Sequence, residues 1–128
     1  MNKVKVGVIG VGRMGKYHVG ILSEFPEVEL AAVVDIDSKT RKVIEDNYST
    51  PGFENYKDIY GKVDAAVVAV PTGLHFSITK DLLNAGIHVL LEKPCANSLE
   101  HARELFKIAQ EKDLTLHIGH VERFNGAV

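Results

Sequence analysis

The sequence predicts an α/β domain built on a doubly wound parallel sheet. Short apolar runs alternate along the chain with segments of helical spacing, and the runs cover residues 3–10, 29–35, 64–70, 88–92 and 114–119. Several runs are apolar at nearly every position, which is typical of strands covered on both faces. Strands that alternate with helices form such a sheet through right-handed crossovers. Ligands of these sheets bind at the carboxyl ends of the strands, so function is expected there.

Four segments carry apolar residues at helical spacing. They contain Met14, Ile21, Leu22 and Phe25; Val43, Ile44 and Tyr48; Ile78, Leu82 and Ala85; and Leu99, Ala102, Leu105, Phe106 and Ala109. Asn97 and Glu100 form a capping-box-like start for the fourth helix, and Gly86 stands where the third should end. The turn-rich segment 49–61 leaves room for one short strand and one short helix.

Length and composition indicate one cytoplasmic domain. The chain has 128 residues, of which 45% are hydrophobic and 25% charged, with a net charge of −2. This balance argues against nucleic-acid binding, and no apolar stretch approaches the roughly 18 residues that cross a bilayer. The single cysteine cannot form an internal disulfide, and the first residues enter a strand without a signal-peptide pattern. We therefore expect neither nucleic acid nor a membrane as partner.

The first predicted strand runs into a glycine-rich turn. Gly10, Gly12 and Gly15 form a GxGxxG motif that includes Arg13 and Met14 and opens an amphipathic helix. Gly10 permits the tight turn, Gly12 lets the backbone approach a pyrophosphate, and Gly15 lets the helix pack closely on the sheet. The N–H groups and the dipole at the helix start attract the diphosphate. The motif in this context predicts a Rossmann-type dinucleotide site rather than a ligand-free turn.

An acid ends the second predicted strand. Asp35 stands 20 residues past Gly15, where a carboxylate can accept hydrogen bonds from both hydroxyls of the adenosine ribose. The same charge would repel a 2′-phosphate, so we expect NAD rather than NADP. Arg41 qualifies this expectation, because a nearby arginine can receive that phosphate. The alternative role of Asp35, capping the next helix, fits Asp37 or Ser38 better.

The strand predicted at 64–70 ends in Pro71, Thr72 and a glycine, a combination that stops the ladder and turns the backbone. His75 follows in the first turn of the next helix. It either faces the same cleft or is a solvated or capping residue, and the residues alone leave both open.

The run 88–92 ends in Glu92, Lys93 and Pro94. A lysine beside a substrate hydroxyl can stabilise developing alkoxide, and a desolvated lysine can move a proton near neutral pH. Glu92 can orient this lysine or approach the second ribose. Taken alone, however, Glu92 and Lys93 fit an exposed ion pair in a loop better than they fit a catalytic site.

No metal site is expected. His117 and His120 are spaced HxxH, which on an extended strand places the two side chains on opposite faces. Cys95 has no evident partner base at fixed spacing, so we interpret it as a small packing residue.

Together and in order, these motifs resemble the N-terminal domain of the glucose–fructose oxidoreductase / inositol dehydrogenase / rhizopine catabolism (Gfo/Idh/MocA) family. The matching segments are GVIGVGRMGKYHV, VVDID, VAVPTGLH, VLLEKPCA and GHVERFN. The resemblance implies hydride transfer between NAD(P) and a secondary alcohol of a sugar, sugar nucleotide or cyclitol. It implies a catalytic role for Lys93 and contact of Asp35 with the adenosine ribose. Along the cofactor it places Pro71, Thr72, His75, Glu92 and Lys93.

The resemblance also implies a second α/β domain that supplies the substrate pocket and a general acid/base histidine. Residues 1–120 then form the dinucleotide-binding domain, and residues 121–128 begin the crossover to a domain absent from this chain. We expect a shortened chain that binds cofactor without turnover, and a homo-oligomer is possible through the absent sheet. The alternatives are a stand-alone NAD(H)-binding sensor and, fitting less well, a methyltransferase.

Overall fold

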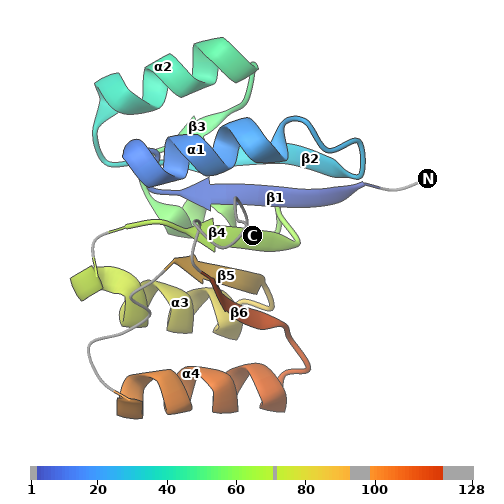
Figure 1. Cartoon of the computed structure of the whole chain (residues 1–128), viewed down its shortest axis with the longest axis vertical. Helices are drawn as coiled ribbons and strands as arrows, with labels where there is room; N and C mark the ends of the chain where they lie inside the picture. Colours follow the sequence, from blue (N-terminus) through green and yellow to red (C-terminus); the bar gives the residue numbers. More distant parts are fainter. Residues whose placement is uncertain (1–2, 71, 93–98, 120–128) are drawn as a thin grey trace, which may run out of the picture.

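The computed structural model describes residues 3–70, 72–92 and 99–119, and these form a six-stranded parallel sheet (Figure 1). Its strands are β1 (Val4–Ile9), β2 (Val28–Val34), β3 (Gly52–Phe53), β4 (Ala65–Val68), β5 (His88–Glu92) and β6 (Leu116–Gly119). They lie in the order β3-β2-β1-β4-β5-β6, so the winding direction reverses between β1 and β4. The predicted doubly wound, Rossmann-type sheet is confirmed.

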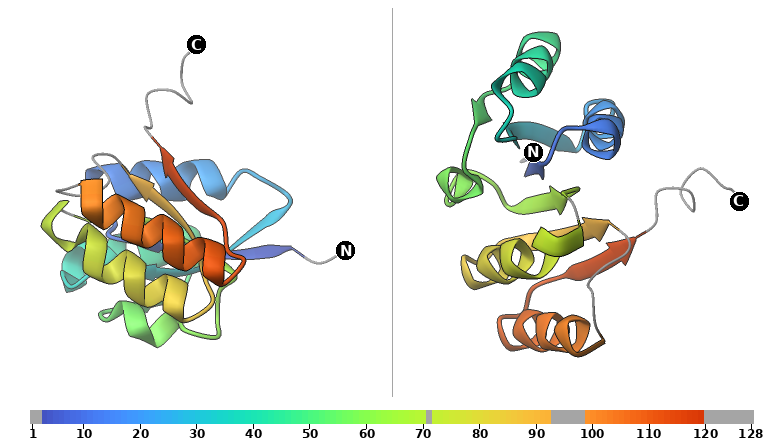
Figure 2. Two further views of the ribbon diagram at one scale, coloured as in Figure 1. Left: turned by 90° about the horizontal axis from the view of Figure 1, so that it is seen from below. Right: turned by 90° about the vertical axis from the view of Figure 1, so that its left-hand side faces the viewer.

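Helices cover both faces of the sheet. α1 (Arg13–Leu22) and α2 (Ser38–Tyr48) lie on one face, and α3 (His75–Asn84) and α4 (Leu99–Glu111) lie on the other (Figure 2). The 3-10 helices η1 (Tyr56–Ile59) and η2 (Thr72–Leu74) precede β4 and α3. The segment 49–61 thus holds one short strand and one short helix, as predicted. Across the described ranges, none of the helices has the length and apolarity that a membrane span requires.

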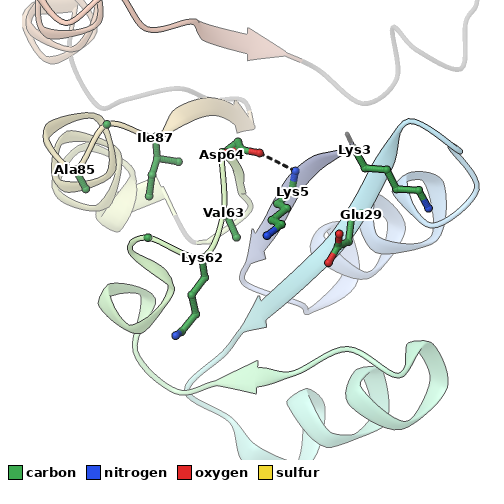
Figure 3. Close-up of a pocket in the computed structure, with 10 residues that line it drawn as sticks. Lys3, Lys5, Glu29, Lys62, Val63, Asp64, Ala85 and Ile87 are labelled. Atoms are coloured by element: carbon green, nitrogen blue, oxygen red, sulfur yellow. Dashed lines mark hydrogen bonds between the residues drawn. The ribbon is translucent and has the colours of Figure 1, made fainter. Parts of the chain in front are cut away.

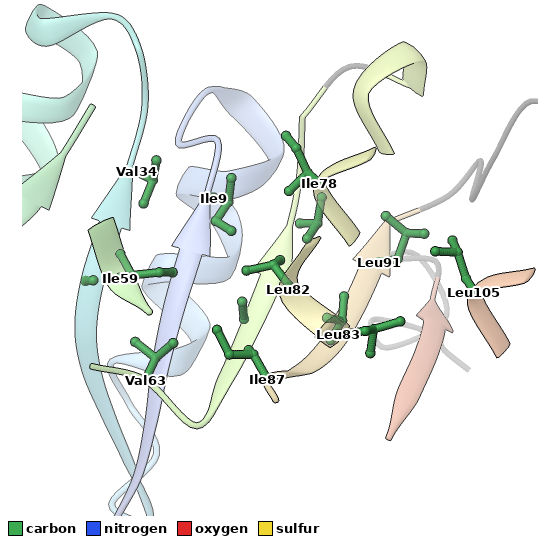
Figure 4. Packing of buried hydrophobic residues seen from close by; sticks show 14 of the residues in the cluster. Ile9, Val34, Ile59, Val63, Ile78, Leu82, Leu83, Ile87, Leu91 and Leu105 are labelled. Carbon is green, nitrogen blue, oxygen red and sulfur yellow. The ribbon is translucent and has the colours of Figure 1, made fainter. Parts of the chain in front are cut away.

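Each face of the sheet has its own apolar core, because successive side chains of a strand point to opposite faces. Val8 of β1 packs in a cluster with Val19 of α1 and Ile44 of α2. Its neighbour Ile9 belongs to the opposite cluster, which includes Leu82 of α3 (Figure 4). All five side chains are at most 2% exposed. Burying one such side chain stabilises the fold by about 1.5–3 kcal/mol.

The first helix is shorter than its apolar pattern predicts. α1 ends at Leu22, and Phe25 lies in the turn beyond it with 50% of its surface exposed. The predicted place of Phe25 on the helix is therefore wrong. Pro26 disfavours helical backbone at the residue before it, which ends the helix although the apolar spacing continues.

Other predicted helix features have mixed outcomes. Val43 of α2 and Phe106 of α4 are 49% and 46% exposed, so they lie at the margins of the apolar faces. Gly86 follows the C-cap residue Ala85 and has a φ of +83°, which confirms the predicted end of α3. Asn97, the first residue of the predicted capping box, lies outside the described residues.

Helix α1 packs closely against the glycine turn at Gly15. A Cβ placed there would overlap the carbonyl oxygen of Gly10. Gly10 cannot retreat, because its φ is +88° and its N–H donates to the carbonyl of Val34 at 2.7 Å. A Cβ on Gly10 itself would lie 2.7 Å from the carbonyl oxygen of Ala69. The turn is therefore held between β2, β4 and α1 only while both positions are glycine.

Two glycines of the same helix should respond oppositely to alanine. We expect Gly15→Ala to destabilise the fold by about 2 kcal/mol or more, because a backbone atom blocks the new methyl group. Gly20→Ala should stabilise it by about 0.5–1 kcal/mol, because alanine is the better helix former. The Cβ at Gly20 would meet only the Tyr48 hydroxyl, at 3.6 Å. Urea unfolding followed by circular dichroism measures both, and a Gly15→Ala chain of native stability would contradict the packing argument.

Candidate functional site

A groove of about 850 Å³ opens where the carboxyl ends of β1, β2 and β4 meet. Its lining comes from the glycine turn, the tip of β2, the segment that includes η1, and the start of α3. This is the point at which the strand order reverses, where open α/β sheets bind ligands. Gly12 and Asp35, which the sequence places just after the first and second predicted strands, both line it.

A second groove, of about 840 Å³, lies at the opposite edge of the sheet (Figure 3). Exposed charged residues surround it, among them Lys5, Lys62 and Asp64. The Asp64 carboxylate accepts a hydrogen bond from the backbone N–H of Lys5 at 3.0 Å. This edge carries the amino ends of the strands, and no helix among the described residues begins there at a glycine turn, so the features that predict a dinucleotide site are not found at this edge in the described part of the chain.

The glycine turn leaves space and backbone donors for an anion. Gly12 is the N-cap of α1, and a Cβ placed on it would have no atom within 4 Å. Because Gly12 has no side chain, it supplies no cap to the first N–H groups of the helix. Arg13 and Met14 are the first two residues of α1. Backbone N–H groups in open space at a helix start form a ready site for a phosphate.

The Asp35 carboxylate joins two of these elements. Its Oδ2 accepts the backbone N–H of Val11 at 3.0 Å, and its Oδ1 accepts that of Asp37 at 2.9 Å. The half-buried side chain therefore ties the glycine turn to the segment that follows β2. Each carboxylate oxygen has two lone pairs, so both can still accept a ligand hydroxyl. This structural role was missed from the sequence, because only the pairing of β1 with β2 brings Val11 to Asp35.

Helix α2 begins at an acid other than Asp35. Asp37 is the N-cap and accepts the N–H groups of Lys39 at 3.0 Å and Thr40 at 3.4 Å. The Thr40 hydroxyl also donates to it at 3.1 Å, and this bond is the main reason that the pKa of Asp37 is lowered. The prediction that Asp37 suits the cap better than Asp35 is confirmed.

Arg41 lies beside the tip of β2. Its Nη1 donates to the backbone carbonyl of Asp35 at 2.7 Å, and its Nε lies 3.3 Å from Oε2 of Glu45. The arginine named from the sequence as a receiver for a 2′-phosphate is therefore next to the groove, and it is already paired with an acid.

His75 lies behind the wall of the groove. It is 2% exposed, and its Nε2 is 2.7 Å from the carbonyl oxygen of Val70. Val70 and Leu74 line the groove on this side. His75 thus holds the turn between β4 and α3, and its predicted contact with the cofactor stays a prediction.

The far wall of the groove includes η1, which the sequence did not single out. Glu54, Asn55 and Tyr56 line it. The Tyr56 hydroxyl donates a hydrogen bond to the carboxylate of Asp81 on α3. Burial, followed by this hydrogen bond, raises the pKa of Tyr56 above its ordinary range. No spacing rule could have revealed the pair, since it joins residues 25 apart across two turns.

The remaining predicted site residues are placed only in part. Glu92 is the last residue of β5, and Thr72 begins η2. Lys93, predicted to be catalytic, and Pro71 lie outside the described residues, as does the predicted crossover 121–128. Among the residues described, no group of three His, Cys, Asp or Glu could hold a metal ion.

Proteins of one family resemble this chain along almost its whole length. The Gfo/Idh/MocA family model, described as an oxidoreductase family with an NAD-binding Rossmann fold, matches residues 4–120. UDP-N-acetylglucosamine 3-dehydrogenase of Acidithiobacillus ferrooxidans is 32% identical over 128 residues, 100% of this chain and 40% of that protein. Rhizopine catabolism protein MocA of Rhizobium meliloti is 33% identical over 126 residues, 97% of this chain and 39% of that protein.

The fold has solved counterparts as well. The crystal structure of GenD2 from gentamicin A biosynthesis in complex with NAD matches with a TM-score of 0.90 and 31% identity. The match covers 93% of this chain and 35% of that one. This chain spans about 40% of the length of the curated relatives that it matches.

The Tyr56–Asp81 bond predicts a specific alkaline response of stability. The raised pKa means that the bond stabilises the fold fully below about pH 10, the ordinary tyrosine value. As the pH rises further, the unfolded chain ionises first and this contribution is lost. We expect Tyr56→Phe to be less stable than the native chain at pH 8, with the difference in unfolding free energy shrinking between pH 10 and pH 11. A difference that is constant up to pH 11 would contradict this.

Proposed function

Because this chain belongs to the Gfo/Idh/MocA oxidoreductase family, as an NAD-binding Rossmann domain, we propose that the groove at the β1–β4 reversal binds NAD in preference to NADP. We further propose that the whole protein transfers a hydride between this cofactor and a secondary alcohol of a sugar, sugar nucleotide or cyclitol. The observation that carries the first proposal is the Asp35 carboxylate, which borders the same groove as Gly12.

The proposed cofactor pose follows from the charges and space around the groove. The pyrophosphate would lie at Gly12, against the N–H groups at the start of α1. The adenosine ribose would lie at Asp35, whose oxygens retain lone pairs for its hydroxyls. The exposed apolar side chains of Ile36 and Leu74 border the groove and offer surface for the adenine ring.

The preference for NAD rests on electrostatics. A 2′-phosphate at this position would lie close to the Asp35 carboxylate. Two unit charges about 4 Å apart at an effective dielectric of 20 repel by about 4 kcal/mol. Two hydroxyls, by contrast, each gain a hydrogen bond to a charged acceptor, worth about 1.5–3 kcal/mol.

The chemical step is proposed for Lys93, which follows the last residue of β5. When bound, NAD supplies the hydride acceptor. Oxidation of a secondary alcohol moves a hydride from the carbinol carbon to that acceptor and releases the hydroxyl proton to a base. The ammonium group of Lys93 would stabilise the developing alkoxide beside it. The sensor alternative gains no support, because the matched relatives include a named dehydrogenase.

Asp35→Asn tests the cofactor proposal. NADH binding should weaken about tenfold or more, because hydrogen bonds to a charged acceptor are lost, while the preference for NADH over NADPH should narrow. NADH and NADPH fluorescence titrations of this chain measure both affinities.

Asp64→Asn is the matched control, since Asp64 also accepts a backbone N–H, but at the opposite sheet edge. It should leave both affinities within about twofold, since distant exposed charges are screened. If the native chain bound neither nucleotide, the proposed function would be wrong.

Lys93→Met tests the catalytic proposal in a protein that also contains a substrate domain. We expect kcat to fall about 100-fold or more, as removal of a general acid–base group commonly causes. NADH affinity should fall far less than kcat, because the proposed cofactor contacts of Gly12 and Asp35 remain. Lys93→Arg keeps the charge but titrates far above neutral pH, so it separates charge stabilisation from proton transfer. Native kcat in Lys93→Met would remove this residue from the mechanism.

A further inference from the structure

We propose that Glu45 is a positioning residue for cofactor choice: by pairing with Arg41, it withholds the arginine from a 2′-phosphate. This inference rests on the proposed function, because it concerns the adenosine ribose end of the same groove. It adds a second source of NAD preference to the carboxylate of Asp35.

Arg41 is close enough to the ribose position to matter. Its Nη1 donates at 2.7 Å to the backbone carbonyl of Asp35, the residue whose carboxylate borders the groove. Guanidinium has five N–H donors in a planar fork that suits phosphate oxygens. An arginine in this place would therefore favour a 2′-phosphate unless its charge and its donors were engaged elsewhere.

Glu45 compensates the charge of Arg41 and accepts the hydrogen bond from its Nε. Its Oε2 lies 3.3 Å from Nε of Arg41, one helical turn earlier on α2. The two side chains are 19% and 31% exposed, whereas the neighbouring Lys42–Asp46 pair of the same helix is 72% and 63% exposed. Water and salt therefore screen the Arg41–Glu45 pair less than its neighbour.

Gly52 makes room for this pair on β3. A Cβ on Gly52 would overlap the Glu45 carboxylate and come within 2.8 Å of Cγ of Arg41. β3 is itself joined to the ribose end, since the Asp35 N–H donates to the carbonyl of Phe53 at 3.1 Å. The ion pair is thus packed over the strand beside the groove, and its geometry depends on a glycine there.

The electrostatic consequence differs between the two cofactors. A 2′-phosphate would meet the negative charges of Asp35 and Glu45, with the positive charge of Arg41 already compensated. The adenosine ribose of NADH carries no charge at this point, so the Arg41–Glu45 pair has little effect on NADH binding. Removing the charge of Glu45 should therefore improve NADPH binding selectively.

The test compares two neutralising variants of neighbouring residues on α2. We expect Glu45→Gln to bind NADPH about fivefold to tenfold more tightly than the native chain, with NADH affinity within about twofold. Asp46→Asn removes the same charge from the exposed Lys42–Asp46 pair and should leave both affinities within about twofold. Fluorescence titrations of the native chain and the two variants with NADH and NADPH, at fixed ionic strength, give the six dissociation constants.

Two further variants show whether the effect passes through Arg41. Adding Arg41→Gln to Glu45→Gln should abolish the gain in NADPH affinity, which a purely structural role of Glu45 would not predict. Gly52→Ala keeps every charge but crowds both the Glu45 carboxylate and the Arg41 side chain, so it should change the ratio of NADPH to NADH affinity through the geometry of the pair alone.

The possible outcomes are distinguishable. If the native chain binds NADH and the ratio of NADPH to NADH affinity in Glu45→Gln stays within twofold of the native ratio, this inference alone is overturned. An equal gain in Asp46→Asn would also overturn it, because the effect would then be general charge removal. Native chain that binds neither nucleotide would overturn the proposed function itself.

Discussion

The Asp35 carboxylate is the contact on which the carboxyl edge of this domain depends. It accepts backbone N–H groups from Val11 in the glycine turn and from Asp37 at the start of α2. Two loops that are far apart in sequence are thereby fixed against each other beside β1 and β2. The Val11 N–H is part-buried, and without this acceptor it would cost roughly 1–3 kcal/mol. The residue that faces the proposed ribose is therefore also a structural link.

The opposite wall of the groove depends on the apolar core on the face of the sheet covered by α3 and α4. η1 packs through the fully buried Ile59 against the face covered by α3 and α4, and Tyr56 bonds to Asp81 on α3. These contacts fix the segment that includes Glu54 and Asn55 relative to the glycine turn. Because apolar packing is nondirectional, the polar Tyr56–Asp81 bond adds orientation that the core alone would not specify.

The parts of the site that could be predicted from the sequence are local. The spacing of Gly10 and Gly15 predicts that α1 packs closely on the turn before it. The place of Asp35 at the end of an apolar run identifies it as a strand-tip residue. The Val11–Asp35 bond depends on which strands are neighbours, and the Tyr56–Asp81 bond depends on how η1 packs on α3; neither leaves a periodic signal. Phe25 shows the opposite kind of error: the apolar spacing is present in the sequence, but the helix is not, because Pro26 ends it earlier.

The two proposed sources of cofactor preference, Asp35 and the Arg41–Glu45 pair, differ in their coupling to the fold. Loss of the Asp35 carboxylate alters the charge and also removes a side-chain acceptor from at least one of two backbone N–H groups, so the proposed selectivity and the stability change together. The Arg41–Glu45 pair packs beside Gly52 of β3, and Glu45 accepts no hydrogen bond from the glycine turn in the described residues. The proposed selectivity can therefore shift at Glu45 while the glycine turn, the proposed pyrophosphate site, stays intact. Under the proposed function, a domain built in this way can exchange one nicotinamide dinucleotide for the other without rebuilding its phosphate site.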